Sequence, residues 1–452
     1  MDIKGKKILV VGLGISGFEA ANLLFEKGAK VAVTESLSSE SVKNREGILL
    51  GKGVKVETGG HTRSFSEGCD AVIVSPGVDK NVLHALGYKN SSVPIIGELE
   101  LGCLFCKAPI TAITGTNGKT TVTSLMGEIY ALAGKDTIVC GNIGNPLSGE
   151  ISKIGPDSQV VLEVSSFQLE TIKSFRPHVA VLLNVTDDHY DRHGGFENYK
   201  AQKFKVFSNQ KETDWAILHG DFEGDAALNS IKSKILFYGA GNSRYRAEED
   251  RVILFTDRDE KVFITADETD IKGRHNMENI ACCCQIAEIE GISPVITKKA
   301  IKDFRGLEHR FQKIASYGGI EFIDDSKATN VDATKRALES IDRRVALIAG
   351  GRDKLGDYMV LADLIKNKVS VLVVIGEASD NICKAFSGLV NILRASSMED
   401  AVKKAVSLAK NGEAVMLSPM CSSFDMFDSY AHRGRVFREA VKKISLGCDL
   451  QK

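Results

Sequence analysis

Residues 110–121 read ITAITGTNGKTT, a short apolar run followed by a glycine-rich turn and the start of a helical pattern. The main-chain N–H groups of such a turn, together with the positive end of the helix dipole, form a binding site for phosphate. Lys119 adds a charge that can reach the outer phosphates, and the Thr120 hydroxyl is suited to bind Mg²⁺. The standard pattern has a glycine where this chain has Ile113. The strand–turn–helix order still predicts a nucleoside triphosphate site, against the alternative of a tight turn without a ligand.

The composition places the chain in a broad class. It has 452 residues, of which 43% are hydrophobic and 26% are charged, and its formal net charge is −1. These values are typical of a globular protein in water with about three domains. A near-zero net charge favours neither nucleic acid nor an anionic membrane as a partner, and no apolar run approaches the ~18 residues of a membrane span. The ten cysteines are scattered, as in a reducing compartment, so we expect a cytoplasmic protein.

Strand-like runs alternate with helical patterns along the whole chain, in three groups. This alternation predicts an α/β fold with mostly parallel sheets that helices cover on both faces. We expect a Rossmann-like N-terminal domain in residues 1–97, a central P-loop ATPase-type domain in residues 98–304 and a C-terminal Rossmann-like domain in residues 305–452. A polar stretch around residues 242–251 indicates a β-rich insertion in the central domain.

A second glycine-rich turn, GLGISG in residues 12–17, follows the apolar run of residues 8–11. Glu35 follows the next strand-like run, where a dinucleotide-binding fold places the acid that binds ribose. Main-chain N–H groups and a helix dipole serve any diphosphate, however. Residues 75–77 (Ser-Pro-Gly) end a later strand and would lie at the same sheet edge. We interpret this region as a nucleotide-diphosphate site; the alternatives are an NAD-dependent oxidoreductase and a turn without a ligand.

Polar residues also end the strand-like runs of the central segment. Glu163 and His189 each follow such a run, and Asn142 lies in a turn at another strand end. The carboxyl ends of parallel strands meet at one edge of a sheet, which is where ligands bind. Glu163 and His189 could there hold a hard cation that bridges phosphates. Lys203, by contrast, is one of three lysines in residues 199–205, and its own context indicates only a solvated helix face.

The third segment carries three polar motifs, each directly after an apolar run. They read DDSKATN in residues 324–330, GGRDK in residues 350–354 and SPMCSSFD in residues 418–425. Cationic side chains beside hydroxyl and main-chain donors suit a small dicarboxylate. Several such motifs at successive strand ends of one sheet indicate a cleft.

In this order, the motifs closely resemble the Mur ligase family, the ATP-dependent enzymes of peptidoglycan precursor synthesis, over essentially the whole chain. The string DSKATN in residues 325–330, the turn in residues 12–17 and the string EVSSFQLE in residues 163–170 resemble the family members that add D-glutamate to UDP-N-acetylmuramoyl-L-alanine. The resemblance implies a cytoplasmic, monomeric ligase that uses ATP and two Mg²⁺ ions. It also implies an acyl-phosphate intermediate and then a tetrahedral one, with release of ADP and phosphate.

The resemblance further implies roles for single residues. Contacts with the ATP phosphates are implied for Gly115, Thr116, Asn117, Gly118, Lys119, Thr120 and Thr121. Contacts with the rest of the nucleotide are implied for Asn276, Asn279, Arg310 and Asp325. One Mg²⁺ ion would be bound by Thr120 and Glu163, and the second by His189 and a carbamylated Lys203. The catalytic residues would be Lys119, Glu163, His189 and Lys203.

The same resemblance implies two sets of substrate contacts. The UDP moiety would be held by Ile15, Ser16, Glu35, Ser75, Pro76 and Gly77, with Asn142 and Ser165 along the path of the acceptor. D-Glutamate would be received by Lys327, Thr329, Lys354, Ser423, Phe424 and Tyr430. The family often has Asp where this chain has Glu35, and Phe where it has Tyr430.

Three other functions compete with a Mur-type ligase. A folylpolyglutamate synthetase is an amide ligase of the same superfamily, but its relatives lack an N-terminal sugar-nucleotide module such as residues 12–17 indicate. An NAD-dependent oxidoreductase would leave the P-loop and the C-terminal motifs unexplained. A regulatory nucleotide-binding module without catalysis would not need the set of Lys119, Glu163, His189 and Lys203.

Overall fold

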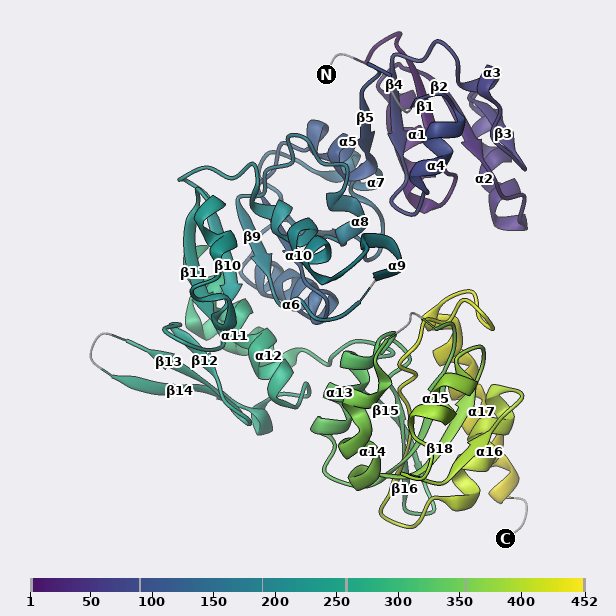
Figure 1. The fold of residues 1–452 in the computed structure, drawn as a ribbon. Helices are drawn as coiled ribbons and strands as arrows, with labels where there is room; N and C mark the ends of the chain where they lie inside the picture. Colours follow the sequence, from purple (N-terminus) through teal and green to yellow (C-terminus); the bar gives the residue numbers. More distant parts are fainter. Residues whose placement is uncertain (1–2, 89–90, 189, 257–258, 354–355, 450–452) are drawn as a thin grey trace.

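The computed structural model describes residues 3–88, 91–188, 190–256, 259–353 and 356–449. Three α/β units follow one another along the chain, with the N-terminal unit at the top of Figure 1, the central unit in the middle and the C-terminal unit at the bottom. Each unit is built on its own sheet, and the central unit carries a smaller second sheet.

The N-terminal unit contains a five-stranded parallel sheet of order β3-β2-β1-β4-β5. Its strands are β1 (Lys7–Val11), β2 (Lys30–Glu35), β3 (Lys55–Thr58), β4 (Ala71–Val74) and β5 (Ile95–Gly97). Its helices are α1 (Ile15–Glu26), α2 (Glu40–Gly51), α3 (Arg63–Ser66) and α4 (Lys80–Ala85). The start of α1 packs tightly on the turn after β1, because a Cβ atom on Gly17 would lie 1.9 Å from the main-chain oxygen of Gly12. Only glycine allows this approach.

The central unit contains a six-stranded parallel sheet of order β11-β10-β9-β6-β8-β7. Its strands are β6 (Ile110–Thr114), β7 (Thr137–Gly141), β8 (Gln159–Glu163), β9 (Val179–Leu182), β10 (Trp215–His219) and β11 (Lys234–Tyr238). Its helices are α5 (Glu98–Phe105), α6 (Lys119–Leu132), α7 (Leu147–Glu150), α8 (Ser166–Leu169), α9 (Tyr190–His193), α10 (Phe196–Phe204), α11 (Arg274–Ile289) and α12 (Pro294–Asp303). The P-loop strand β6 lies between β8 and β9, so residues at the ends of three neighbouring strands meet.

The β-rich insertion predicted near residues 242–251 is present as an antiparallel sheet. It consists of β12 (Tyr245–Ala247), β13 (Arg251–Phe255) and β14 (Glu260–Thr265). The insertion follows β11 and leads into α11, which packs with α6 over one face of the central sheet (Figure 1). The run Cys282–Cys284 lies fully inside this packed layer, as small buried residues often do.

The C-terminal unit contains a six-stranded sheet of order β15-β16-β20-β17-β18-β19, in which only the pair β15–β16 is antiparallel. Its strands are β15 (Gln312–Tyr317), β16 (Ile320–Asp324), β17 (Val345–Gly350), β18 (Val369–Ile375), β19 (Ile392–Arg394) and β20 (Ala414–Leu417). Its helices are α13 (Val331–Ser340), α14 (Ala362–Lys368), α15 (Ser379–Ala385), α16 (Met398–Leu408) and α17 (Tyr430–Asp449). Strands β17 and β20 are buried along their whole length, because helices cover both faces of the sheet.

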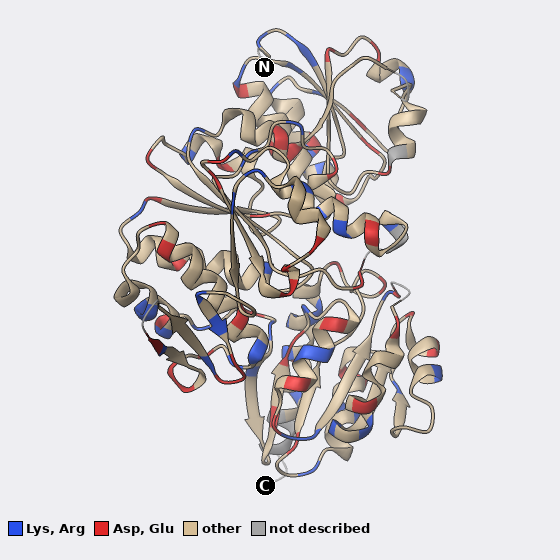
Figure 2. Ribbon diagram, turned by 60° about the vertical axis from the view of Figure 1, so that its left-hand side comes forward, with Lys and Arg blue, Asp and Glu red and all other residues tan. Residues whose placement is uncertain are grey.

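The predicted fold class is confirmed: the chain forms three α/β units with mostly parallel sheets. The limits given above for the three domains, 1–97, 98–304 and 305–452, stay a prediction. Basic and acidic residues are mixed over all three units, in keeping with the near-zero net charge (Figure 2). Among the described residues, no helix combines the length and the apolar character that crossing a bilayer requires.

Candidate active site

The P-loop turn begins two residues later than the standard pattern suggests. Ile113 is a buried residue of β6, and the main chain leaves the strand at Gly115, which has a φ of +152°. Gly118 precedes α6 with a φ of +85°, and a Cβ atom there would lie 2.5 Å from Asn279 Oδ1. Lys119 Nζ donates to the main-chain oxygens of Gly115 (2.8 Å) and Thr116 (2.7 Å), across the mouth of the turn.

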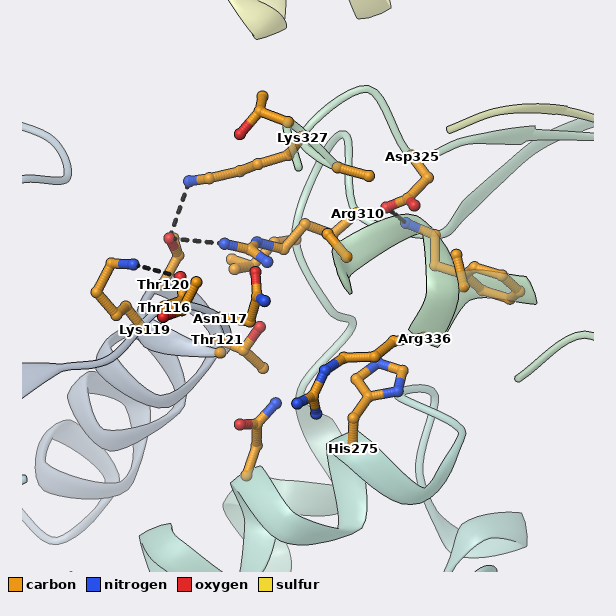
Figure 3. Close-up of a pocket in the computed structure, with 18 of the residues that line it drawn as sticks. Thr116, Asn117, Lys119, Thr120, Thr121, His275, Arg310, Asp325, Lys327 and Arg336 are labelled. Atoms are coloured by element: carbon orange, nitrogen blue, oxygen red, sulfur yellow. Dashed lines mark hydrogen bonds between the residues drawn. The ribbon is translucent and has the colours of Figure 1, made fainter. Parts of the chain in front are cut away.

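A cavity of about 290 Å³ opens over this turn, between the central and C-terminal units. The central unit contributes residues 116–121, Asn142, Glu163, Asp188, Ile271, His275, Asn276 and Asn279. The C-terminal side contributes Leu307, Arg310, Phe311, Asp325, Lys327, Ala328, Thr329, Asn330, Ala333, Arg336, Ala337 and Tyr430. Figure 3 shows Arg310 and Lys327 reaching the P-loop from the side opposite α6.

The Thr120 hydroxyl is one of the points where the two units are in direct contact. Its Oγ1 accepts hydrogen bonds from Lys327 Nζ (2.8 Å) and Arg310 Nη2 (2.9 Å). Lys327 also lies 4.7 Å from the centre of the Tyr430 ring, and it donates to the Tyr430 hydroxyl at 3.3 Å. Burial, together with the charges of Arg310 and Lys119, lowers the pKa of Lys327 to about 7.

Glu163 ends β8 beside the P-loop and is 2% exposed. Its Oε1 accepts a hydrogen bond from Asn142 Nδ2 at 2.8 Å, whereas its buried Oε2 has no hydrogen-bond partner among the described residues. Burial alone would raise the pKa of Glu163, but the charges of Lys327 and Lys119 hold it below its ordinary value. An ionised, buried carboxylate with an unused oxygen suits a cation that other ligands, such as phosphates, also bind.

Lys203 corrects the interpretation of a solvated helix face. Its side chain is 1% exposed, and its Nζ donates to the main-chain oxygen of Gly115 at 2.7 Å. The ammonium lies 4.5 Å from the centre of the Tyr199 ring. Burial and the charge of Lys119 lower its pKa well below the ordinary lysine value, although Asp188 and Glu163 act in the opposite direction. Lysine residues on a helix look alike in sequence, so the sequence alone could not show which one turns inward.

A second cavity, of about 670 Å³, lies between the N-terminal and central units. The predicted UDP-binding residues Ile15, Ser16, Glu35, Ser75, Pro76 and Gly77 line it, together with Asn142. Asn142 thus lies on the walls of both cavities. His61 and Leu37 also line it, and the sequence analysis did not include them.

Glu35 holds the glycine-rich turn of the N-terminal unit together. Its Oε2 accepts from the main-chain N–H of Leu13 (2.6 Å), and its Oε1 accepts from the main-chain N–H of Leu37 (2.9 Å) and the Ser36 hydroxyl (3.1 Å). Burial would raise the pKa of Glu35, but these donors lower it below the ordinary value. Glu35, at the position where a dinucleotide-binding fold has its ribose-binding acid, therefore hydrogen-bonds to the glycine-rich turn of its own unit.

Comparison with known proteins adds to this geometry. Three family models match consecutive parts of the chain: the Mur ligase MurD-like N-terminal domain at residues 6–97, the Mur ligase middle domain at residues 113–287 and the Mur ligase glutamate ligase domain at residues 309–421. A UDP-N-acetylmuramoylalanine–D-glutamate ligase of Koribacter versatilis is 41% identical over 449 residues, which cover 98% of this chain and 99% of the relative. The chain belongs to the Mur ligase family.

Other relatives of this Mur ligase agree. The ligase of the same name from Geotalea daltonii is 41% identical over 452 residues, covering 99% of both chains. Among solved structures, MurF from Acinetobacter baumannii superposes with a TM-score of 0.64 at 16% identity, covering 95% of this chain and 93% of its own. A pseudomurein peptide ligase type C from Methanothermus fervidus superposes with a TM-score of 0.62 at 22% identity, covering 97% and 100%. These structures support the three-unit fold, and the oxidoreductase interpretation of the N-terminal turn falls away.

The structure gathers most of the predicted nucleotide residues of this Mur ligase on one wall or another of the first cavity. They are Thr116, Asn117, Gly118, Lys119, Thr120, Thr121, Asn276, Asn279, Arg310 and Asp325. Burial raises the pKa of Asp325 to about 7, even though the Ser418 hydroxyl and the main-chain N–H of Phe311 donate to it. His275 and Arg336 line this cavity but were not among the predicted site residues, and Asn330 was noted only as part of the motif in residues 324–330. Burial next to Arg336 and Arg310 lowers the pKa of His275 to about 4.

Only some of the residues predicted to bind D-glutamate in this Mur ligase line the first cavity. Thr329, Lys327 and Tyr430 line the first cavity, whereas Ser423 is 2% exposed in a packed loop and Phe424 is 63% exposed. His189 and Lys354 lie outside the described residues. Ser165 caps the N-terminus of α8 in a capping box with Gln168, which lines the second cavity.

A buried arginine ties the C-terminal loops together. Arg433 of α17 is 1% exposed and donates to four main-chain oxygens, those of Ser326 (2.9 Å), Cys421 (3.0 Å), Ser422 (3.2 Å) and Gly350 (3.5 Å). These oxygens belong to the last residue of β17 and to the loops after β16 and β20, so Arg433 contacts all three motifs of the third segment. Burial lowers the pKa of Arg433 to about 10. Nothing in the sequence marked this residue.

Proposed function

We propose that this protein adds D-glutamate to UDP-N-acetylmuramoyl-L-alanine with ATP as energy source, giving ADP and phosphate, as a step of peptidoglycan precursor synthesis. The relatives that match over the full chain carry the name of this reaction. The single observation that carries the proposal is the cavity in which the P-loop meets Lys327 and Arg310 from the C-terminal side. A site of this kind holds a nucleotide and a small acid at one place.

The first chemical step is an in-line attack of the substrate carboxylate on the γ-phosphate of ATP. The main-chain N–H groups of Gly118 and of the first turn of α6 are suited to bind the phosphates, whereas those of Thr116 and Asn117 donate to Asn184 and hold the turn in shape. Lys119, which spans the turn through the oxygens of Gly115 and Thr116, places its charge where the transferring group becomes more negative. Asn142 lies on both cavities and is therefore suited to guide the acceptor carboxylate from the N-terminal unit to the P-loop.

Two Mg²⁺ ions belong to this proposal, and the residues present fit the first. Thr120 and Glu163 would hold it, because the Glu163 Oε2 atom is buried and has an unused acceptor. Among the described residues no cluster of three His, Cys, Asp or Glu side chains could hold a metal. Mg²⁺ binds in proteins through one or two protein ligands, water and substrate phosphates, so Thr120 and Glu163 would suffice as its protein ligands. When bound, the ions offset charge on the transferring phosphoryl group.

The second ion would rest on His189 and on a carbamylated Lys203. Carbamylation joins the lysine nitrogen to CO₂ and releases a proton, so it needs a neutral amine. Burial of Lys203 beside Lys119 favours the neutral form, and the product would turn a buried cation into an anionic oxygen ligand. The buried place of Lys203 next to Gly115 supports this assignment.

The second chemical step is the attack of the D-glutamate amine on the acyl phosphate. It gives a tetrahedral intermediate, from which phosphate leaves as the amide forms. The amino acid is proposed to be received by Lys327, Thr329, Lys354, Ser423, Phe424 and Tyr430. The UDP moiety is proposed to be held by Ile15, Ser16, Glu35, Ser75, Pro76 and Gly77.

Water would destroy the acyl phosphate, so we infer that the C-terminal unit closes on the central unit during the cycle. We also propose that the protein is a monomer in the cytoplasm, with domain boundaries between residues 97 and 98 and between residues 304 and 305.

Phosphate release tests the proposal directly. Purified protein is supplied with ATP, Mg²⁺ and UDP-N-acetylmuramoyl-L-alanine, across a panel of amino acids that includes both enantiomers of glutamate. We expect release only with D-glutamate. Release with another amino acid would keep the mechanism and overturn the specificity. No release with any amino acid would overturn the ligase proposal.

A further inference from the structure

Helix α13 of the C-terminal unit begins on the surface of the central unit. Asn330 caps it: its Oδ1 accepts from the main-chain N–H of Ala333 at 2.8 Å, and its Nδ2 donates to Asp188 Oδ2 at 2.9 Å. One amide thus starts the helix and binds the loop after β9. Asp332 follows in the first turn, where a carboxylate is favoured by the helix dipole.

One oxygen of Asp332 joins both units. Its Oδ2 accepts from Asn117 Nδ2 of the P-loop (2.6 Å), from the Thr186 hydroxyl of the central unit (3.3 Å) and from Arg336 Nε one turn along α13 (3.0 Å). The Asp332 and Arg336 side chains are about one-fifth to one-quarter exposed, so water screens these bonds only in part. Hydrogen bonds to an ionised acceptor are stronger than those between neutral groups.

Asn117 is held at its main chain as well. Its N–H donates to Asn184 Oδ1 at 2.8 Å, and its oxygen accepts from Asn184 Nδ2 at 3.1 Å. The amide of Asn184 therefore fixes the backbone of this P-loop residue from within the central unit. Asp332 fixes its side chain from the C-terminal unit, which makes the P-loop geometry depend on both.

Arg336 connects the same carboxylate to the nucleotide cavity. It lines the cavity beside His275, on the side away from Lys119 (Figure 3). Its Nη1 lies 3.7 Å from Glu278 Oε2 on α11, so the guanidinium is held between a carboxylate of each unit. A planar guanidinium that is fixed in this way at the cavity wall is suited to bind a nucleotide, by hydrogen bonds or by stacking on the base.

We propose that Asp332 is a positioning residue for ATP: it holds Asn117 of the P-loop and Arg336 of the cavity wall at once, so that the C-terminal unit completes the nucleotide site. The inference rests on the proposed function only in taking ATP as the nucleotide. It assigns to α13 a part in ATP binding that is separate from the reception of the amino acid by the loops after β16, β17 and β20.

The test compares nucleotide affinity with substrate affinity in the full-length protein. Asp332→Ala is expected to weaken the binding of ADP with Mg²⁺ about tenfold by calorimetry, and to raise the KM for ATP by a similar factor. The KM for UDP-N-acetylmuramoyl-L-alanine is expected to stay unchanged. Asn117→Ala is expected to weaken ADP binding as well, and the double variant no more than the more severe single variant, because the two residues share one bond.

Lys335→Ala is the matched control, because Lys335 lies on the same helix, its side chain is 43% exposed, and its Nζ lies 4.0 Å from Glu339 Oε1 on that helix. It is expected to bind ADP as the wild type does. Asp332→Asn keeps the shape and one acceptor, and thermal unfolding of all variants separates folding from affinity. Additive losses in the double variant, or an equal rise in KM for the UDP substrate, would overturn the proposal. ADP binding is measured without D-glutamate, so failure of the ligation assay would count against the proposed function and leave this test valid.

Discussion

The two glycine-rich turns of this protein have the same local design and different dependence on the rest of the molecule. Both connect a buried parallel strand to a helix, after β1 and after β6. The N-terminal turn is braced from inside its own unit, by Glu35 on the main chain of Leu13. The P-loop is contacted by side chains from across a domain boundary: Arg310 and Lys327 at Thr120, and Asp332 at Asn117.

The difference shows that a glycine-rich turn can be held in shape by its own unit alone or can depend on side chains from another unit. A turn that is braced within its own unit keeps its shape whatever the other units do, although the cavity beside it also has a wall from the central unit. A turn completed by another unit has full affinity only when the units are together. The proposed reaction forms a water-sensitive acyl phosphate. Dependence on a second unit therefore suits the proposed ATP site, whereas the proposed UDP site can be formed before the units close. The following changes test this contrast, from the largest expected effect to the smallest.

Lys119→Ala is expected to lower the rate of ATP turnover about 10³-fold, because a charge on the transferring phosphoryl group is lost. Binding of UDP-N-acetylmuramoyl-L-alanine, measured by calorimetry, should stay at the wild-type value, since the N-terminal site does not depend on the P-loop. If substrate binding fell together with turnover, the two turns would not be independent.

Lys203→Ala is expected to lower ligation about 10²- to 10³-fold, because the proposed carbamate would be missing. Added formate or acetate should restore part of the rate by supplying a carboxylate in the space that the side chain leaves. Lys200→Ala on the same helix, where Lys200 pairs with Asp225, serves as the control and should remain active. A fully active Lys203 variant would contradict the second metal site.

Asp325→Asn is expected to change the pH dependence of folding stability without ligand. The pKa of Asp325 is raised to about 7 in the folded protein, so the folded state binds a proton that the unfolded state releases near pH 4. This contribution is present at low pH and is lost as pH rises toward 7. Between pH 5 and pH 7 the wild type should lose about 2–3 kcal/mol relative to the variant, by denaturant unfolding. A constant difference would contradict the raised pKa.

Glu35→Gln is expected to raise the KM for the UDP substrate about fivefold, the value of one weakened hydrogen bond to a charged acceptor. The KM for ATP should not change. A matching rise in both constants would show that the N-terminal turn is coupled to the P-loop after all, and would remove the contrast between the two sites.

The sequence predicted the parts of the fold that local patterns determine. Polar residues at strand ends, such as Glu163 at the end of β8, were placed correctly at the edge of the sheet, because parallel strands bring their carboxyl ends together. The roles of single residues remain predictions, although the P-loop residues and Arg310 do line one cavity.

The sequence could not show what tertiary packing alone decides. Lys203 and Lys200 lie on one helix, and only the packing of α10 against the P-loop buries one of them. Arg433 binds main-chain oxygens, which leave no trace in the sequence. The partnership of Asp332 with Asn117 spans 215 positions, and no local pattern announces it.

Gly118 has a consequence for drug resistance. Its left-handed main chain disfavours any side chain, and even a methyl group would meet the Asn279 amide. An inhibitor that rests against this glycine would therefore touch a position where even the smallest substitution disturbs the P-loop turn. Contacts made there should be harder to lose by mutation than contacts with Phe424, whose side chain is 63% exposed.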